Sequence, residues 1–170
     1  DYNKISENAS AKRIGVIAAD KDIQPIMNGR GDFLPSTTRQ AIDFLSSKSK
    51  KGFFLMVEGA QIDWGSHNND VKYTVTEVID FDKAVSEALK FADKDGHTLV
   101  IITADHETGG MTIPNGNYAK KSVKALYTTA GHSGIMVPVY AYGPYSQEFR
   151  GVQENIDIHK KIIEILSKAK

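Results

Sequence analysis

The stretch that decides the fold reads FFLMVEGAQIDWGSH and covers residues 53–67. It opens with the unbroken apolar run 53–57, which is typical of a β-strand covered on both faces. Acidic and imidazole side chains follow this run, among them Glu58, Asp63 and His67. In open α/β sheets, functional sites gather in the loops after the carboxyl ends of the strands. The stretch therefore predicts a buried strand that leads into a functional site.

The rest of the chain alternates between strand-like and helix-like patterns. Short apolar runs predict further strands at residues 13–18, 99–103 and 137–142. Capping signals, such as Thr37 for the first helix, and helical spacing of apolar residues predict helices at about residues 37–46, 74–95 and from 155 onward. The alternation predicts an α/β fold, a partial sheet with helices on both faces, in which residues 1–170 form a single unit.

Composition and charge narrow the class of protein. The chain has 170 residues, of which 41% are apolar and 25% are charged, as in an ordinary globular protein. The 21 basic residues balance 21 acidic residues, so no net charge argues for binding to nucleic acid or to an anionic membrane. Without cysteine the chain has neither disulfides nor thiolate metal ligands.

The ends and apolar runs of the sequence bear on targeting. No apolar run approaches the roughly 18 residues that a membrane span requires. The chain starts at Asp1, without a methionine, and its first residues are polar. We therefore expect a piece of a longer protein, with no membrane span and no signal peptide in this chain.

Candidate metal ligands recur at the ends of the predicted strands. The third predicted strand leads into Asp105 and His106, and a later loop carries His132. Aspartate, glutamate and histidine without cysteine are typical of a catalytic zinc site. The i, i+4 spacing of Asp63 and His67 places both on one side of a helical turn. Composition and spacing support two interpretations equally. In one these residues form a metal site, and in the other they are helix caps and solvated loop side chains.

The same residues carry a resemblance to a known family. The stretch 53–67, the segment 103–106 and the pair Gly131-His132 resemble the metal-binding motifs of alkaline phosphatases. The match extends to the helix around residues 80–85 and to the strand around residues 139–144. It runs from about residue 34 to the C-terminus in the family's order and spacing. The chain thus resembles the C-terminal portion of an alkaline phosphatase.

The resemblance implies a function and a set of site residues. In the family a serine is phosphorylated and then hydrolysed at two zinc ions with magnesium nearby, which implies metal-dependent hydrolysis of phosphate monoesters. The matching positions are Asp63, His67 and His132 for the first zinc, Asp105 and His106 for the second zinc, and Glu58 for magnesium. The resemblance also implies a periplasmic or extracellular location and a homodimer as the common assembly.

Departures from the family pattern limit what this chain does alone. The nucleophilic serine of the family lies in an Asp-Ser-Ala-like motif that is missing here. Ser66 and Ser133 lie beside ligands, but the resemblance assigns neither that role, and none of the four arginines matches the phosphate-binding arginine. We therefore expect no catalytic nucleophile in this chain, inactivity of the chain alone, and the N-terminal half of the same protein as its partner.

Two alternatives stay open. The first is another phosphohydrolase, mutase or sulfatase of the wider superfamily, whose members share the Asp-x-x-x-His and Asp-His ligands. Glu58, as a magnesium ligand after an apolar strand, favours the monoesterase over that group. The second alternative is a metal-binding module without chemistry of its own.

Overall fold

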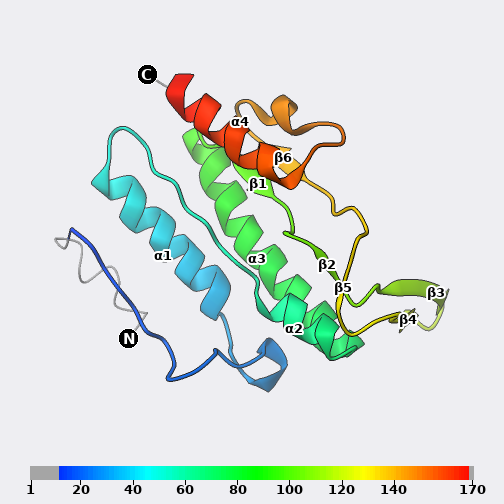
Figure 1. The fold of residues 1–170 in the computed structure, drawn as a ribbon. Helices are drawn as coiled ribbons and strands as arrows, with labels where there is room; N and C mark the ends of the chain where they lie inside the picture. The colour runs from blue at the N-terminus through cyan, green and yellow to red at the C-terminus, as the bar shows by residue number, and fades with distance from the viewer. Residues whose placement is uncertain (1–11, 169–170) are drawn as a thin grey trace.

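The computed structural model describes residues 12–168 (Figure 1). Its α-helices are α1 (Phe33–Lys48), α2 (Gln61–His67), α3 (Val71–Asp95) and α4 (Asn155–Lys168). Two short 3-10 helices lie in the connections, η3 (Ile26–Asn28) and η4 (Ser146–Phe149). Both α1 and α2 pack against α3, so the longest helix is the centre of the described fold. No helix among residues 12–168 is both long and apolar enough to cross a membrane.

The strands of the described chain form three separate antiparallel pairs. The pairs are β1 (Val100–Ile102) with β6 (Tyr140–Tyr142), β2 (Glu107–Thr108) with β5 (His132–Ser133), and β3 (Thr112–Asn117) with β4 (Ser122–Leu126). Together with the helices they make an α/β fold, the class that the sequence predicts. The predicted strands 99–103 and 137–142 correspond to β1 and β6, each shortened to three residues.

Two of the predicted strands are wrong. Residues 13–18 and 53–57 belong to no β-ladder in the described chain. The run 53–57 is also covered on one face only. Phe53 contacts the ring of Phe91 on α3 with centroids 5.9 Å apart, whereas Phe54 is 64% exposed. Because hydrogen bonds to a neighbour hold a strand in place, an apolar run without such a neighbour does not become one.

Helices α1 and α3 begin earlier than their capping signals predict, whereas α4 begins at the predicted residue, Asn155. Helix α3 starts directly after Asp70, because that side chain accepts a hydrogen bond from the backbone N–H of Tyr73 at 3.0 Å. Helix α1 starts at Phe33, so Thr37 lies inside it and donates its hydroxyl proton to the Phe33 carbonyl at 2.7 Å. The end of α3 agrees with the prediction, since Gly96 follows it with a left-handed φ of 72°.

The buried face of α3 carries an ion-pair network. Arg30, in the loop before α1, places its guanidinium 2.5 Å from Glu77 Oε2 and 2.8 Å from Asp80 Oδ2. Burial alone lowers the pKa of Arg30, but its hydrogen bonds with both carboxylates and their negative charges outweigh burial and leave that pKa raised. Glu77 also accepts a hydrogen bond from the backbone N–H of Ile26 at 2.7 Å. The network therefore tethers the loop before α1 to the central helix.

Candidate metal centre

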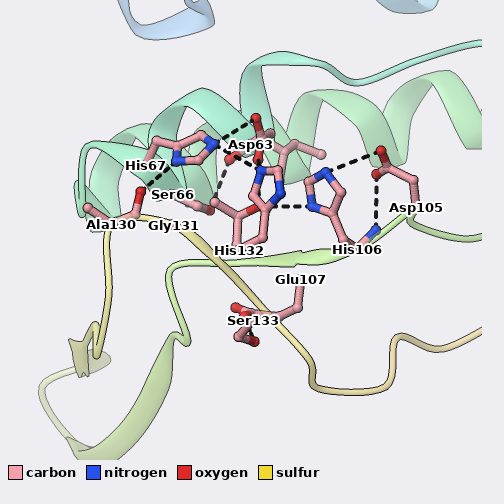
Figure 2. Close-up of polar contacts among 12 residues, drawn as sticks. Asp63, Ser66, His67, Asp105, His106, Glu107, Ala130, Gly131, His132 and Ser133 are labelled. Atoms are coloured by element: carbon pink, nitrogen blue, oxygen red, sulfur yellow. Dashed lines mark hydrogen bonds and ion pairs between the residues drawn. The ribbon is translucent and has the colours of Figure 1, made fainter.

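Asp63, His67 and His132 bring three metal-ligand side chains together in the described chain (Figure 2). One ligand atom of each lies within 4.8 Å of those of the others. Helix α2 presents Asp63 and His67 on one side, with Asp63 Oδ2 3.3 Å from His67 Nε2. Strand β5 brings His132 Nε2 to 3.2 Å from His67 Nε2. We call these three residues the triad.

A backbone contact fixes the proton of one imidazole in the triad. The Nδ1 atom of His67 lies 2.6 Å from the carbonyl oxygen of Ala130. A carbonyl oxygen can only accept a hydrogen bond, so Nδ1 carries the proton. In the neutral ring Nε2 then keeps a free lone pair, and it is Nε2 that faces Asp63 and His132. The triad thus places an unprotonated imidazole nitrogen, which can bind a cation, next to a carboxylate.

The short ladder between β2 and β5 decides which side chains face the triad. Thr108 pairs with His132, and Glu107 pairs with Ser133. Paired residues lie on the same face of a sheet, and successive residues lie on opposite faces. Figure 2 accordingly shows His132 directed toward Asp63, whereas Glu107 and Ser133 lie together on the other side of the strands.

Asp105 and His106 lie beside the triad but outside its group of ligand atoms. The ring of His106 stacks on that of His132, with centroids 3.5 Å apart and an angle of 23° between the planes. Its Nε2 atom lies 3.3 Å from Asp105 Oδ2. Asn155, at the start of α4, donates a side-chain hydrogen bond to the Asp105 carbonyl at 3.2 Å. This second pair therefore has its own anchor in the C-terminal helix.

The remaining predicted ligand stands apart from these contacts. Glu58 is exposed and forms no hydrogen bond or ion pair with another described residue. It precedes α2, which carries Asp63 and the half-exposed Trp64. The predicted magnesium ligand is therefore near the triad in sequence, while no interaction in the described chain ties its carboxylate to the other ligands.

Neither serine beside the ligands faces the triad. Ser66 is buried, and its hydroxyl donates to the Ile62 carbonyl oxygen at 2.9 Å. Ser133 donates its hydroxyl proton to the carboxylate of Glu107, which also accepts from the backbone N–H of Gly110 at 2.8 Å. Both hydroxyls are thus engaged in structural hydrogen bonds.

One residue at the site, Thr108, was not predicted from the sequence. Thr108 donates its hydroxyl proton to Asp63 Oδ1 at 2.5 Å, and the hydroxyl oxygen of Thr108 lies 3.2 Å from His106 Nδ1. Its spacing of two from His106 is the only signal that could have found it, because residues i and i+2 of an extended segment share a face. That signal is too common to single out one threonine.

Comparison with known proteins points to one family. The family model for alkaline phosphatase matches residues 2–126. Alkaline phosphatase 4 of Bacillus subtilis is 37% identical over a match that covers 81% of this chain and 44% of that relative. The alkaline phosphatase of Escherichia coli is 36% identical over 76% of this chain and 31% of its own length.

A solved structure gives the same likeness. A variant of the alkaline phosphatase from the Antarctic bacterium TAB5, with Mg bound, superposes with a TM-score of 0.88 at 44% sequence identity. The match covers 96% of this chain and 49% of that protein. The chain spans about half the length, or less, of the relatives that it matches.

Proposed function

The chain belongs to the alkaline phosphatase family, and we propose on that premise that it contributes the metal-binding part of an enzyme that hydrolyses phosphate monoesters. The observation that carries this proposal is the convergence of Asp63, His67 and His132. A carboxylate and two imidazoles are a donor set typical of catalytic zinc. The proton that His67 gives to Ala130 leaves the facing nitrogen free to bind a cation.

The proposed metal ligands extend beyond the triad. The triad would hold the first zinc, Asp105 and His106 would hold the second zinc, and Glu58 would contribute to a magnesium site. Zinc bound at such sites acts as a Lewis acid on phosphoryl oxygens. The ring of His106 stacks on that of His132, which supports the proposal that the two zinc sites lie side by side. Support for Glu58 comes from the resemblance alone.

We propose that the nucleophile and the phosphate-binding arginine lie in further segments of the protein. Ser66 is buried, and Ser133 faces away from the triad. Arg30 is held by two carboxylates of α3, so its positive charge is already compensated. The chain also spans only 44% of its Bacillus subtilis relative. The remainder of the domain is thus the proposed partner of this chain. On the basis of the resemblance, we also propose that the whole protein forms a homodimer and is periplasmic or extracellular.

Zinc binding tests the proposal directly. The chain is loaded with zinc, dialysed and analysed for metal, and about one tightly held zinc per chain is expected. His132→Ala should remove most of this zinc, whereas His159→Ala, an exposed histidine of α4, should not. A zinc content near zero in the unchanged chain would contradict the proposed first site.

A chimaera separates an enzyme from a non-catalytic metal-binding module. Residues 34–168 of this chain replace the corresponding segment of a complete family member, and hydrolysis of an aryl phosphate is measured. We expect hydrolysis that depends on His132 and survives His159→Ala. A folded chimaera that binds zinc but hydrolyses nothing would favour the module.

A further inference from the structure

We propose that Thr108 is a positioning residue that joins the two proposed zinc sites through a single hydroxyl group. The inference rests on the proposed function, because it concerns side chains that would hold the metal ions. Thr108 contacts one residue from each site: Asp63 of the triad and His106 of the second pair.

The hydroxyl of Thr108 can make both contacts in only one way. A carboxylate accepts hydrogen bonds and donates none, so the one hydroxyl proton goes to Asp63 Oδ1 at 2.5 Å. The oxygen then offers a lone pair to His106 Nδ1 at 3.2 Å, and Nδ1 must carry a proton to use it. In the neutral ring the other nitrogen, Nε2, is left unprotonated.

This proton arrangement prepares both ligands for a cation. The unprotonated Nε2 of His106 is the atom that lies 3.3 Å from Asp105 Oδ2. At Asp63, Thr108 occupies Oδ1 and leaves Oδ2 facing His67 Nε2. The hydroxyl thus fixes the tautomer of His106 and the orientation of the Asp63 carboxylate together. Partners of this kind orient ligands and raise the metal affinity of a site.

The backbone of Thr108 places the hydroxyl where these contacts are possible. Its ladder partner is His132, so the side chains of both residues lie on the face that carries the triad. A β-branched residue suits this short strand, which makes valine a replacement of nearly equal shape without the hydroxyl. The position therefore allows the hydroxyl to be removed with little change in packing.

Zinc affinity measures the first consequence. Thr108→Val, Thr108→Ser and the unchanged chain compete for zinc with a chromogenic chelator. We expect Thr108→Val to bind zinc about 10–100-fold more weakly, and Thr108→Ser to regain most of the loss. Thr76→Val is the matched control, because the Thr76 hydroxyl donates only to carbonyls of its own helix. It should bind zinc as the unchanged chain does.

The tautomer of His106 gives a second readout that needs no metal. In the metal-free chain at alkaline pH, nitrogen NMR of the imidazoles should show His106 protonated at Nδ1. Thr108→Ser should keep this form, and Thr108→Val should lose it. Equal zinc affinity and an unchanged His106 tautomer in folded Thr108→Val would overturn the inference. If the unchanged chain binds no zinc, the proposed function fails, and the tautomer measurement still decides the role of Thr108.

Discussion

The Nδ1 atom of His67 lies 2.6 Å from the carbonyl oxygen of Ala130, in the loop that leads to His132. The backbone of the loop that precedes His132 thus orients His67, the other histidine of the triad. The contact gives His67 two separable functions, a structural hydrogen bond through Nδ1 and a proposed metal bond through Nε2. A substitution that keeps the first and removes the second can tell them apart.

His67→Asn should separate these functions. An asparagine amide can still donate to the Ala130 carbonyl, but it has no atom at the Nε2 position. We expect zinc binding to fall strongly, while the free energy of unfolding of the metal-free chain changes by less than about 1 kcal/mol. Zinc competition and urea unfolding measure the two quantities. His97→Asn, in the exposed turn after α3, should change neither. Undiminished zinc binding would remove His67 from the site.

The ion pairs of Arg30 should dominate the stability of the loop before α1. Arg30→Ala leaves two buried carboxylates, Glu77 and Asp80, without a cation. Breaking a buried pair from one side costs about 3–5 kcal/mol, so urea unfolding should show a loss of that order. The control is Arg39→Ala, whose exposed side chain is 3.7 Å from Glu87 and should contribute about 0–1 kcal/mol. Equal losses in both variants would contradict the role given to Arg30.

The sequence predicts local features of the site better than distant ones. The spacing of Asp63 and His67 places them on one side of a helical turn, and in α2 their ligand atoms are 3.3 Å apart. The position of His132 beside Asp63 and His67 depends on the two-residue ladder between β5 and β2. No local sequence pattern determines the register of that ladder. The contact from Thr108 to Asp63 depends on the same register, so it could not be predicted.

The fold shows the same division between local and distant interactions. The end of α3 at Gly96 was readable from the sequence, because a left-handed residue after a helix favours glycine. The run 53–57 has the composition of a buried strand, but composition cannot tell which neighbour will pair with it. Arg30 and its buried partners were also unpredictable, since a loop residue reaches α3 across 47 and 50 positions.

Gly65 should be required for the close approach of α2 to α3. A Cβ atom at this position would lie 2.8 Å from the backbone nitrogen of Thr74. Replacing a helical glycine by alanine normally stabilises by about 1 kcal/mol, but crowding against a backbone costs about 1–3 kcal/mol. Because this backbone belongs to α3 and cannot move freely, we expect Gly65→Ala to lower the free energy of unfolding and to weaken zinc binding. Gly134→Ala has open space around the new methyl group and should do neither. A more stable Gly65→Ala variant would contradict this packing.

Tyr73 should make the fold sensitive to alkaline pH. Burial, followed by the negative charge of Glu77, raises the pKa of Tyr73, whose hydroxyl donates to Gln61. A raised pKa in the folded state stabilises the fold below the unfolded value of about 10, and this contribution is lost as the pH rises through the folded value. Between pH of about 9 and about 11, the free energy of unfolding should therefore fall less in Tyr73→Phe than in the unchanged chain. Tyr118→Phe, at a fully exposed tyrosine, should keep the original slope. Identical slopes in all three proteins would refute the assignment.

The 170-residue chain should not hydrolyse phosphate monoesters by itself. A covalent intermediate needs a nucleophile at the metal site, and the hydroxyls of Ser66 and Ser133 are held elsewhere. Because we propose that the phosphate-binding arginine lies in another segment of the protein, we expect the chain also to lack a share of the roughly 7–11 kcal/mol that positioning can contribute. We expect no burst and no turnover of an aryl phosphate above a zinc-only control, in excess zinc and magnesium. A complete family member provides the positive control. Turnover that a chelator abolishes, zinc restores and Ser133→Ala or Ser66→Ala removes would show that one of these serines reaches the metal site.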